Sequence, residues 1–196
     1  MFYKPEFRKS LRSRRQQLDS ASIQQAAEQV AAKLIVLPEF IKAKHIASYV
    51  SDENELDPNV IINAARHLDK HIFLPVIPTN GDKHLTYYPY DSDDTLVANH
   101  YNILEPKTNS IQAADTESFD IILVPLVGFD KHCNRLGRGA GYYDHSLAFT
   151  IGKNTDERPL LVGLAYEFQK LSEFEPSKWD VPLDIIITEK EIYQRM

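Results

Sequence analysis

The sequence predicts an α/β fold with a mainly parallel sheet, and two observations support this. Residues 121–124 form an apolar run whose length and β-branching are typical of a strand buried on both faces of a parallel sheet, and residues 160–166 form a second run that is expected to pair with it. Segments with helical patterns separate such runs along the chain. Strands that alternate with helices build a parallel sheet covered by helices.

The segment 5–18 is a predicted helix. Phe7, Leu11 and Leu18 recur in it at intervals near the helical repeat, as expected for a buried face. Several basic residues share this segment, and a charge run is usually a solvated face. The basic residues that we assign to solvent are Arg12, Arg14 and Arg15.

Further elements follow in chain order. Residues 21–36 are a predicted helix that Ser20 or Ser22 can cap. The segment 91–118 is polar and interrupted by Pro and Asp, and Trp179 is expected in the core. The remaining predictions are strands at 45–50, 71–77, 85–90 and 185–188, and helices near 58–69 and 142–149.

Length and composition indicate one soluble domain, 1–196. Hydrophobic content of 43% and charged content of 26% are ordinary for a globular protein. The chain contains no apolar run near the roughly 20 residues that span a bilayer, so we expect no membrane contact. The single cysteine, Cys133, excludes an internal disulfide and fits a reducing compartment; we interpret it as an incidental loop residue.

The net charge of −6 is unevenly distributed. Residues 1–18 carry six basic residues and one acidic residue, which leaves the remainder strongly acidic. An acidic body argues against a nucleic-acid surface, because backbone binding needs broad basic patches. The basic start lacks the serine enrichment of a mitochondrial transit peptide and runs directly into a helical pattern, so we expect a cytoplasmic protein.

A glycine-rich loop separates the strand at 121–124 from the predicted helix at 142–149. Its glycines stand at 137, 139 and 141, beside Arg135 and Arg138. Backbone N–H groups at a helix start favour an anion, glycines let phosphate oxygens approach the backbone, and arginines add charge-assisted bonds. The loop therefore predicts an anion cradle.

Two common phosphate motifs do not match this loop. A dinucleotide fingerprint would need glycine where Tyr142 stands, and no Lys-Ser or Lys-Thr follows the glycines as in a Walker A loop. From spacing alone, a surface turn in which glycines only supply positive φ angles is equally compatible with the pattern.

Residues 125–144, PLVGFDKHCNRLGRGAGYYD, resemble the signature of the 5-formyltetrahydrofolate cyclo-ligases, also called methenyltetrahydrofolate synthetases. That pattern runs P-x-[LV]-x-F-D and then R-L-G-x-G-x-G-Y-Y-D. The resemblance continues over nearly the whole chain, in the spacing of Lys4, Arg8 and Leu18 and in the closing motif DVPLDIIIT at 180–188. It implies a three-layer α/β/α fold in a single domain.

The resemblance implies a carbon–nitrogen bond-forming ligase that converts 5-formyltetrahydrofolate to 5,10-methenyltetrahydrofolate and releases ADP and phosphate. ATP is then the co-substrate and Mg²⁺ the cofactor. The partners are these small molecules, with no nucleic acid and no membrane, and we expect a monomer. Of the basic residues, Arg138 and Lys4 take the catalytic role of neutralising the phosphates. The implied ATP-binding residues are Lys4, Arg8, Arg135, Leu136, Gly137, Arg138, Gly139, Ala140, Gly141, Tyr142 and Tyr143.

The resemblance also implies a folate site and a metal site. Glu55, in the element Glu55-Leu56-Asp57, is the implied folate contact; a carboxylate suits the donor edge of a pterin ring. The other implied folate contacts are Tyr101, Pro125 and Tyr142. Asp144 and Asp184 are the implied magnesium ligands, since carboxylates with substrate phosphates usually hold this ion. Asp180 is expected to order its loop.

Two other classes of function stay open from the residues alone. One is a different small-molecule enzyme on a related α/β scaffold, such as a sugar-phosphate isomerase or an acyl-CoA transferase. Such an enzyme would not need Lys4, Arg8 and Asp184 together. The other is a binding protein for RNA or a folate without ATP turnover, and the acidic body counts against the RNA version.

Overall fold

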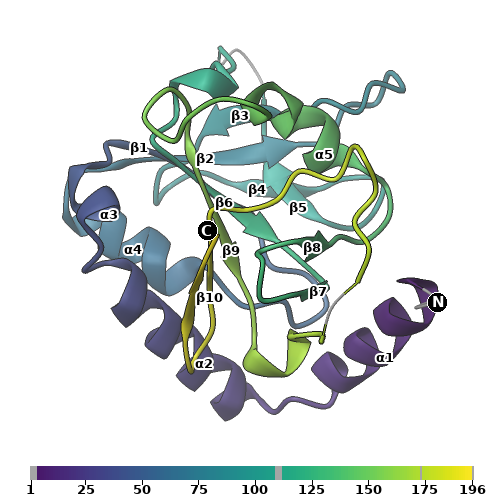
Figure 1. The fold of residues 1–196 in the computed structure, drawn as a ribbon. Helices are drawn as coiled ribbons and strands as arrows, with labels where there is room; N and C mark the ends of the chain where they lie inside the picture. The colour runs from purple at the N-terminus through teal and green to yellow at the C-terminus, as the bar shows by residue number, and fades with distance from the viewer. Residues whose placement is uncertain (1–3, 109–111, 173, 196) are drawn as a thin grey trace.

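The computed structural model describes residues 4–108, 112–172 and 174–195, and its centre is a seven-stranded sheet (Figure 1). The strand order is β11-β10-β9-β6-β1-β2-β3. The inner strands pair in parallel. At the two edges, β3 pairs antiparallel with β2, and β11 pairs antiparallel with β10. The bounds are β1 His45–Ala47, β2 His71–Val76, β3 Thr86–Pro89, β6 Ile121–Pro125, β9 Leu160–Leu164, β10 Ile185–Ile187 and β11 Ile192–Gln194.

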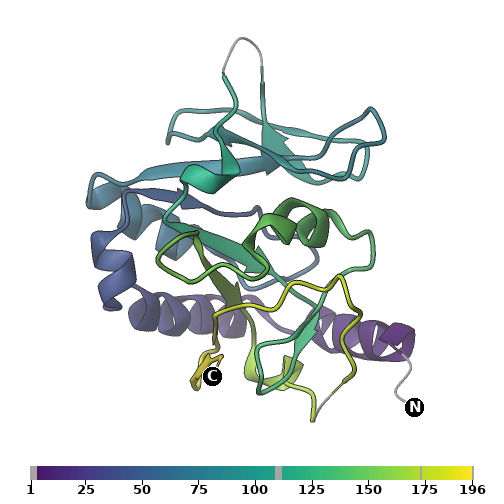
Figure 2. The same ribbon diagram turned by 45° about the horizontal axis from the view of Figure 1, so that its top comes forward.

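Helices lie on both faces of this sheet (Figures 1 and 2). One buried cluster includes Val30 and Leu34 of α2 and Ile61 of α4, and a second cluster on the other face includes Leu147 of α5. The predicted α/β/α layering and the predicted parallel pairing of β6 with β9 are confirmed. The helices are α1 Lys4–Gln16, α2 Ser20–Leu34, α3 Pro38–Lys42, α4 Asn59–His67 and α5 Tyr142–Leu147, with 3₁₀ turns at Thr116–Ser118, Ala148–Thr150 and Glu167–Gln169.

Two small hairpins were not predicted. One joins β4 Leu96–Ala98 to β5 Leu104–Pro106, inside the polar segment 91–118, of which 109–111 lie outside the described residues. The other joins β7 Gly128–Phe129 to β8 Arg135–Leu136, and the glycines at 137, 139 and 141 follow its second strand. Strands of two or three residues are too short to show a period of two, so their sequences carry no strand signal.

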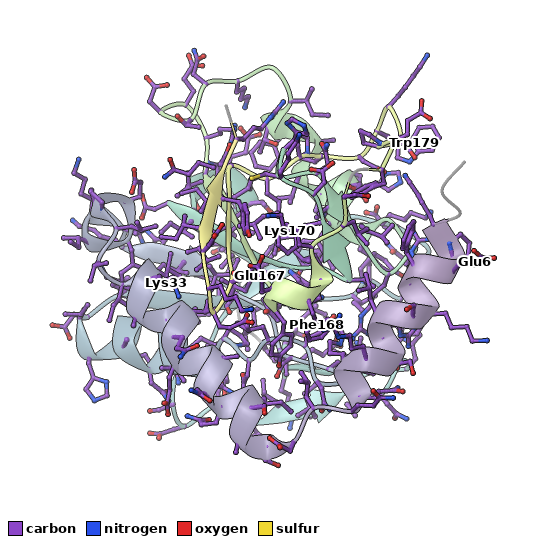
Figure 3. The ribbon with its side chains drawn as sticks, turned by 60° about the horizontal axis from the view of Figure 1, so that its bottom comes forward. Glu6, Lys33, Glu167, Phe168, Lys170 and Trp179 are labelled. Carbon is purple, nitrogen blue, oxygen red and sulfur yellow. The ribbon has the colours of Figure 1, made fainter. Side chains whose placement is uncertain are left out.

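Two local predictions are wrong. Asp19 caps α2, because its Oδ1 accepts a hydrogen bond from the Ser22 amide at 2.7 Å; neither Ser20 nor Ser22 is the capping residue. Trp179 is 71% exposed and lies at the periphery in Figure 3. It belongs to a turn in which Asp180 accepts from the Ser177 amide, and this turn directs the indole away from the core.

None of the described helices is both long enough and apolar enough to cross a membrane.

Gly163 of β9 lies where three apolar side chains meet the sheet. A Cβ built there would lie 2.6 Å from Leu183 Cδ1 and 2.9 Å from Leu126 Cδ2. We expect Gly163→Ala to lower the free energy of unfolding by about 1–3 kcal/mol, because packed cores tolerate added volume poorly. Urea unfolding would measure this change. Gly137→Ala is the control, since its Cβ would meet open space, and equal stability of the two variants would contradict the packing.

Candidate active site

A cavity of about 420 Å³ opens at the carboxyl ends of the central strands. From β1 the chain continues to β2 on one side, whereas β6 lies on the other side of β1, so the strand order reverses between β1 and β6. Ligands bind at this kind of switch point in open α/β sheets. Tyr49 and Val50, which follow β1, line the cavity together with Pro125 at the end of β6.

The glycine-rich loop forms one wall of this cavity. Gly137, Gly139 and Gly141 all line it, and α5 begins directly afterwards at Tyr142. Gly139 and Gly141 have φ angles of +111° and +81°, which side chains rarely adopt, so glycine is required at these two positions. The predicted order of strand, glycine-rich loop and helix start is confirmed.

Helix α1 reaches this loop from outside the cavity. The Arg8 Nε donates to the Gly137 carbonyl at 2.8 Å. The Lys4 Nζ instead bonds Asp180 Oδ2 at 3.0 Å and Ser177 Oγ at 3.1 Å. Arg8 therefore contacts the loop and Lys4 contacts the turn at 177–180, and neither lines the cavity itself.

Arg138 extends from the loop across the cavity to the segment that follows β1. Its Nε donates to Glu55 Oε1 at 3.0 Å, and its Nη1 donates to Asp52 Oδ2 at 2.7 Å. The side chains of Arg138 and Asp52 are about one-third exposed, and that of Glu55 is 6% exposed. The structure thus brings together a residue expected at phosphate and a residue expected at folate.

Glu55 is a buried carboxylate with two cationic neighbours. Burial raises its pKa above the ordinary range of glutamate, and the positive charges of Arg138 and then Arg15 lower it. Its Oε2 also accepts a hydrogen bond from the Asp52 amide at 3.3 Å. The carboxylate is therefore kept in a defined orientation at the cavity wall.

The prediction that Arg12, Arg14 and Arg15 of α1 face solvent is only partly correct. Arg14 is exposed, but Arg15 is buried and Arg12 lines the cavity, where it pairs with Glu53 at 2.5 Å. Arg15 stands four residues after Leu11, the other buried residue of α1. This i, i+4 relation was the signal in the sequence that could have placed Arg15 on the buried face.

Aromatic residues form another part of the cavity wall. The Tyr101 and Tyr142 hydroxyls lie 3.3 Å apart and join the β4–β5 hairpin to the start of α5. Tyr143 also lines the cavity, and its burial raises its pKa well above the ordinary tyrosine range. Such flat walls suit a heterocyclic ligand. Leu136 and Ala140 complete the loop, and of these two only Ala140 lines the cavity.

Asp144 lies beside the loop in contact with Arg135. The Arg135 Nη2 donates to Asp144 Oδ1, which also accepts from the Val181 amide at 3.1 Å. Both Arg135 and Asp144 line the cavity. The segment around Val181 is therefore anchored to the cavity wall, and Asp180 stands next to it in the chain.

Asp184 is not brought to this cavity. It directly precedes β10, which runs parallel to β9 and β6, so it lies at the amino edge of the sheet whereas the cavity lies at the carboxyl edge. Arg158 binds both its carboxylate oxygens at 2.7 Å, and the Leu161 amide donates to Oδ2 at 2.8 Å. These contacts connect the residue before β10 to the start of β9.

A shared Mg²⁺ site of Asp144 and Asp184 does not fit this geometry. Among the described residues, no three His, Cys, Asp or Glu side chains group as a metal site would require. Of the two predicted ligands only Asp144 lines the cavity, where it could hold the ion together with substrate phosphates, because magnesium is usually held by one or two carboxylates with such phosphates. The predicted role of Asp180 in ordering its loop agrees with its bond from the Ser177 amide at 2.8 Å.

Fold and site together define an α/β protein with a charged small-molecule cleft at the strand switch point and a glycine-rich loop in its wall. Residues 2–189 match the model of the 5-formyltetrahydrofolate cyclo-ligase family. The chain belongs to this family of enzymes, and the resemblance seen in the sequence is confirmed.

Relatives with known names cover almost the whole chain. The 5-formyltetrahydrofolate cyclo-ligase of Haemophilus influenzae is 33% identical over 184 residues, which are 93% of this chain and 96% of that protein. The Escherichia coli K12 protein of the same name is 28% identical, with 94% and 99% covered. The solved structure of Aquifex aeolicus 5,10-methenyltetrahydrofolate synthetase matches with a TM-score of 0.81 and 30% identity, over 98% of this chain and 93% of that chain.

Proposed function

We propose that this enzyme uses Mg·ATP to cyclise 5-formyltetrahydrofolate to 5,10-methenyltetrahydrofolate, with release of ADP and phosphate. The observation that carries the proposal is the contact of Arg138 with Glu55 inside one cavity, since it joins a phosphate-binding loop to a buried carboxylate. Named relatives with the same substrate in their names support it.

The phosphate side of the proposed site consists of cations and backbone amides. Arg135 and Arg138 stand in the cavity wall, Arg8 bonds the same loop from outside the cavity, and Lys4 lies against the turn at 177–180. Phosphoryl transfer asks mainly for positioning and charge neutralisation, not for a protein nucleophile. In this proposal the four cations orient the triphosphate, and the loop from Leu136 through Tyr143 approaches it closely.

The folate side consists of Glu55, Tyr101, Pro125 and Tyr142. The Glu55 carboxylate accepts hydrogen bonds from the ring N–H and amino group of the pterin, which form a donor edge. The tyrosine rings and Pro125 supply flat apolar contact beside it. Because Arg138 and Asp52 touch Glu55, the phosphates and the pterin then meet within the same cavity.

The proposed reaction activates a poor leaving group. The formyl oxygen attacks the γ-phosphorus, the bond from that phosphorus to ADP breaks, and an iminium phosphate forms. N10 then attacks the formyl carbon, loses its proton, and phosphate leaves with the formyl oxygen. When bound, Mg²⁺ would neutralise phosphate charge, with Asp144 as the cavity carboxylate that would hold it.

The test is the near-ultraviolet absorbance of methenyltetrahydrofolate when purified protein meets 5-formyltetrahydrofolate. We expect absorbance to grow with Mg·ATP and to stay flat with Mg·ADP, since only ATP can donate the γ-phosphoryl group. Well-folded protein that forms no product with Mg·ATP would contradict the proposal. Product that forms equally without nucleotide would contradict the phosphorylation step.

A further inference from the structure

Arg15 is a buried cation beside Glu55, and it approaches the same carboxylate oxygen, Oε1, as Arg138 does. Its side chain is 1% exposed, and its Nη1 lies 3.7 Å from Glu55 Oε1. The Nη2 lies 3.7 Å from Glu53 Oε2, and neither of these two atoms has a hydrogen-bond partner. A buried, incompletely bonded guanidinium is costly, so its presence calls for an explanation.

Arg15 also supports the backbone of the turn before Glu55. Glu53 and Asn54 have φ angles of 49° and 57°, a left-handed conformation that residues with side chains rarely adopt twice in succession. The Arg15 Nε donates to the Glu53 carbonyl at 2.8 Å, and the Asn54 Nδ2 donates to the Arg15 carbonyl at 3.3 Å. Helix α1 therefore holds this turn from behind.

The two cations that face Glu55 differ in what else they can do. Arg138 stands on the glycine-rich loop, where bound phosphate would compete for its guanidinium, whereas Arg15 is enclosed by α1 and the turn. Among the described residues, the other titratable groups near Glu55 are Tyr49 after β1, Tyr143 on α5 and Tyr166 after β9, together with Asp52 and Glu53 in its own segment, and Glu53 is itself paired with Arg12. If Arg138 exchanges Glu55 for a bound phosphate, Arg15 is the cation that still faces the Glu55 carboxylate.

Stability alone is a weak explanation for Arg15. A buried ion pair is often matched or exceeded in stability by apolar residues of similar volume. We propose that Arg15 is a positioning residue for folate, which holds the Glu55 carboxylate in place and balances its charge while ATP occupies Arg138. The inference rests on the proposed role of Glu55 and adds a residue of α1 to it.

The first experiment compares Arg15→Gln, which loses the charge, with Arg15→Lys, which keeps it. For Arg15→Gln we expect the Kd of 5-formyltetrahydrofolate to rise by about 10–100-fold, because a charge-assisted contact is weakened, while the Kd of Mg·ATP changes by less than about twofold. Arg15→Lys should restore most of the folate affinity. Arg14→Gln, one residue away and exposed, is the matched control and should bind both ligands normally.

The second experiment asks whether Arg15 acts through Glu55. In a Glu55→Gln background, Arg15→Gln should weaken folate binding no further, because two residues in one interaction are not additive. NMR titration of the Glu55 carboxyl should show a higher pKa in Arg15→Gln, since one of the charges that lower it is gone. As the pH falls, folate binding of Arg15→Gln should therefore weaken at a higher pH than that of the wild type.

Several outcomes would overturn the inference. They are equal loss of folate and ATP binding, additive effects with Glu55→Gln, an unchanged pKa of Glu55, or a folded Arg15→Lys as impaired as Arg15→Gln. If Arg15→Gln does not fold, the Lys variant alone decides. Wild-type protein that binds no 5-formyltetrahydrofolate would instead refute the proposed function, and the NMR titration would still test the link between Arg15 and Glu55.

Discussion

Arg138→Ala is expected to lower kcat/KM for ATP by about 10²–10³-fold, as loss of one preorganised donor to a developing charge typically does. The side chain is one-third exposed and bonds only through its charged end to Glu55 and Asp52, so the fold should persist. Steady-state kinetics with varied ATP at saturating folate would measure the loss, and circular dichroism would check the fold.

The control for this variant is Lys153→Ala, which removes an exposed cation paired with Glu117, outside the cavity. It should have wild-type kinetics. An unfolded Arg138→Ala protein, or one with an unchanged kcat/KM for ATP, would reject the assignment of Arg138 to the phosphates.

Glu55→Gln is expected to raise the KM for 5-formyltetrahydrofolate by about 10–100-fold and to leave the KM for ATP nearly unchanged. The amide keeps the size of the side chain but loses the charge that strengthens hydrogen bonds to the pterin, which is worth about 1.5–3 kcal/mol. Initial rates with each substrate varied in turn would separate the two constants.

Asp57→Asn is a matched control for Glu55→Gln. Asp57 lies two residues further along the same segment, does not line the cavity, and accepts from the Asn59 amide at 3.1 Å at the start of α4. It should affect neither KM strongly. Equal losses for folate and ATP in Glu55→Gln would count against a role of Glu55 in folate binding.

The local motif was the part of the site that the sequence predicted best. The glycine-rich loop, Arg138 and Asp144 are close in sequence, and their relation to one strand and one helix start follows from local pattern. The contact of Arg138 with Glu55 spans 83 positions and depends on how β1 and β6 pair. No local sequence pattern predicts the pairing of β1 with β6. Only the resemblance to the family placed Arg138 and Glu55 in one site.

Predictions made from sequence alone are wrong at residues whose environment is set by tertiary structure and not by local pattern. Asp180 and Asp184 both stand in the closing motif, but the direction of β10 puts only the first beside the anchored segment at Val181. In the sequence, Arg15 looks like part of a solvated charge run. It is buried because α1 packs there against the turn that contains Glu53. Trp179 is exposed because its turn leaves the core.

Four cations around the cleft already have carboxylate partners before any ligand enters, whereas Arg8 bonds the Gly137 carbonyl. Lys4 pairs with Asp180, Arg12 with Glu53, Arg135 with Asp144, and Arg138 with Asp52 and Glu55. A phosphate that binds here replaces existing ion pairs, so its binding is an exchange of anions. Part of each new contact energy offsets the contact that is lost, and the locally balanced charge limits long-range attraction of ATP. Affinity for ATP then depends on how readily these carboxylates are released and take new partners, such as a metal ion or a pterin.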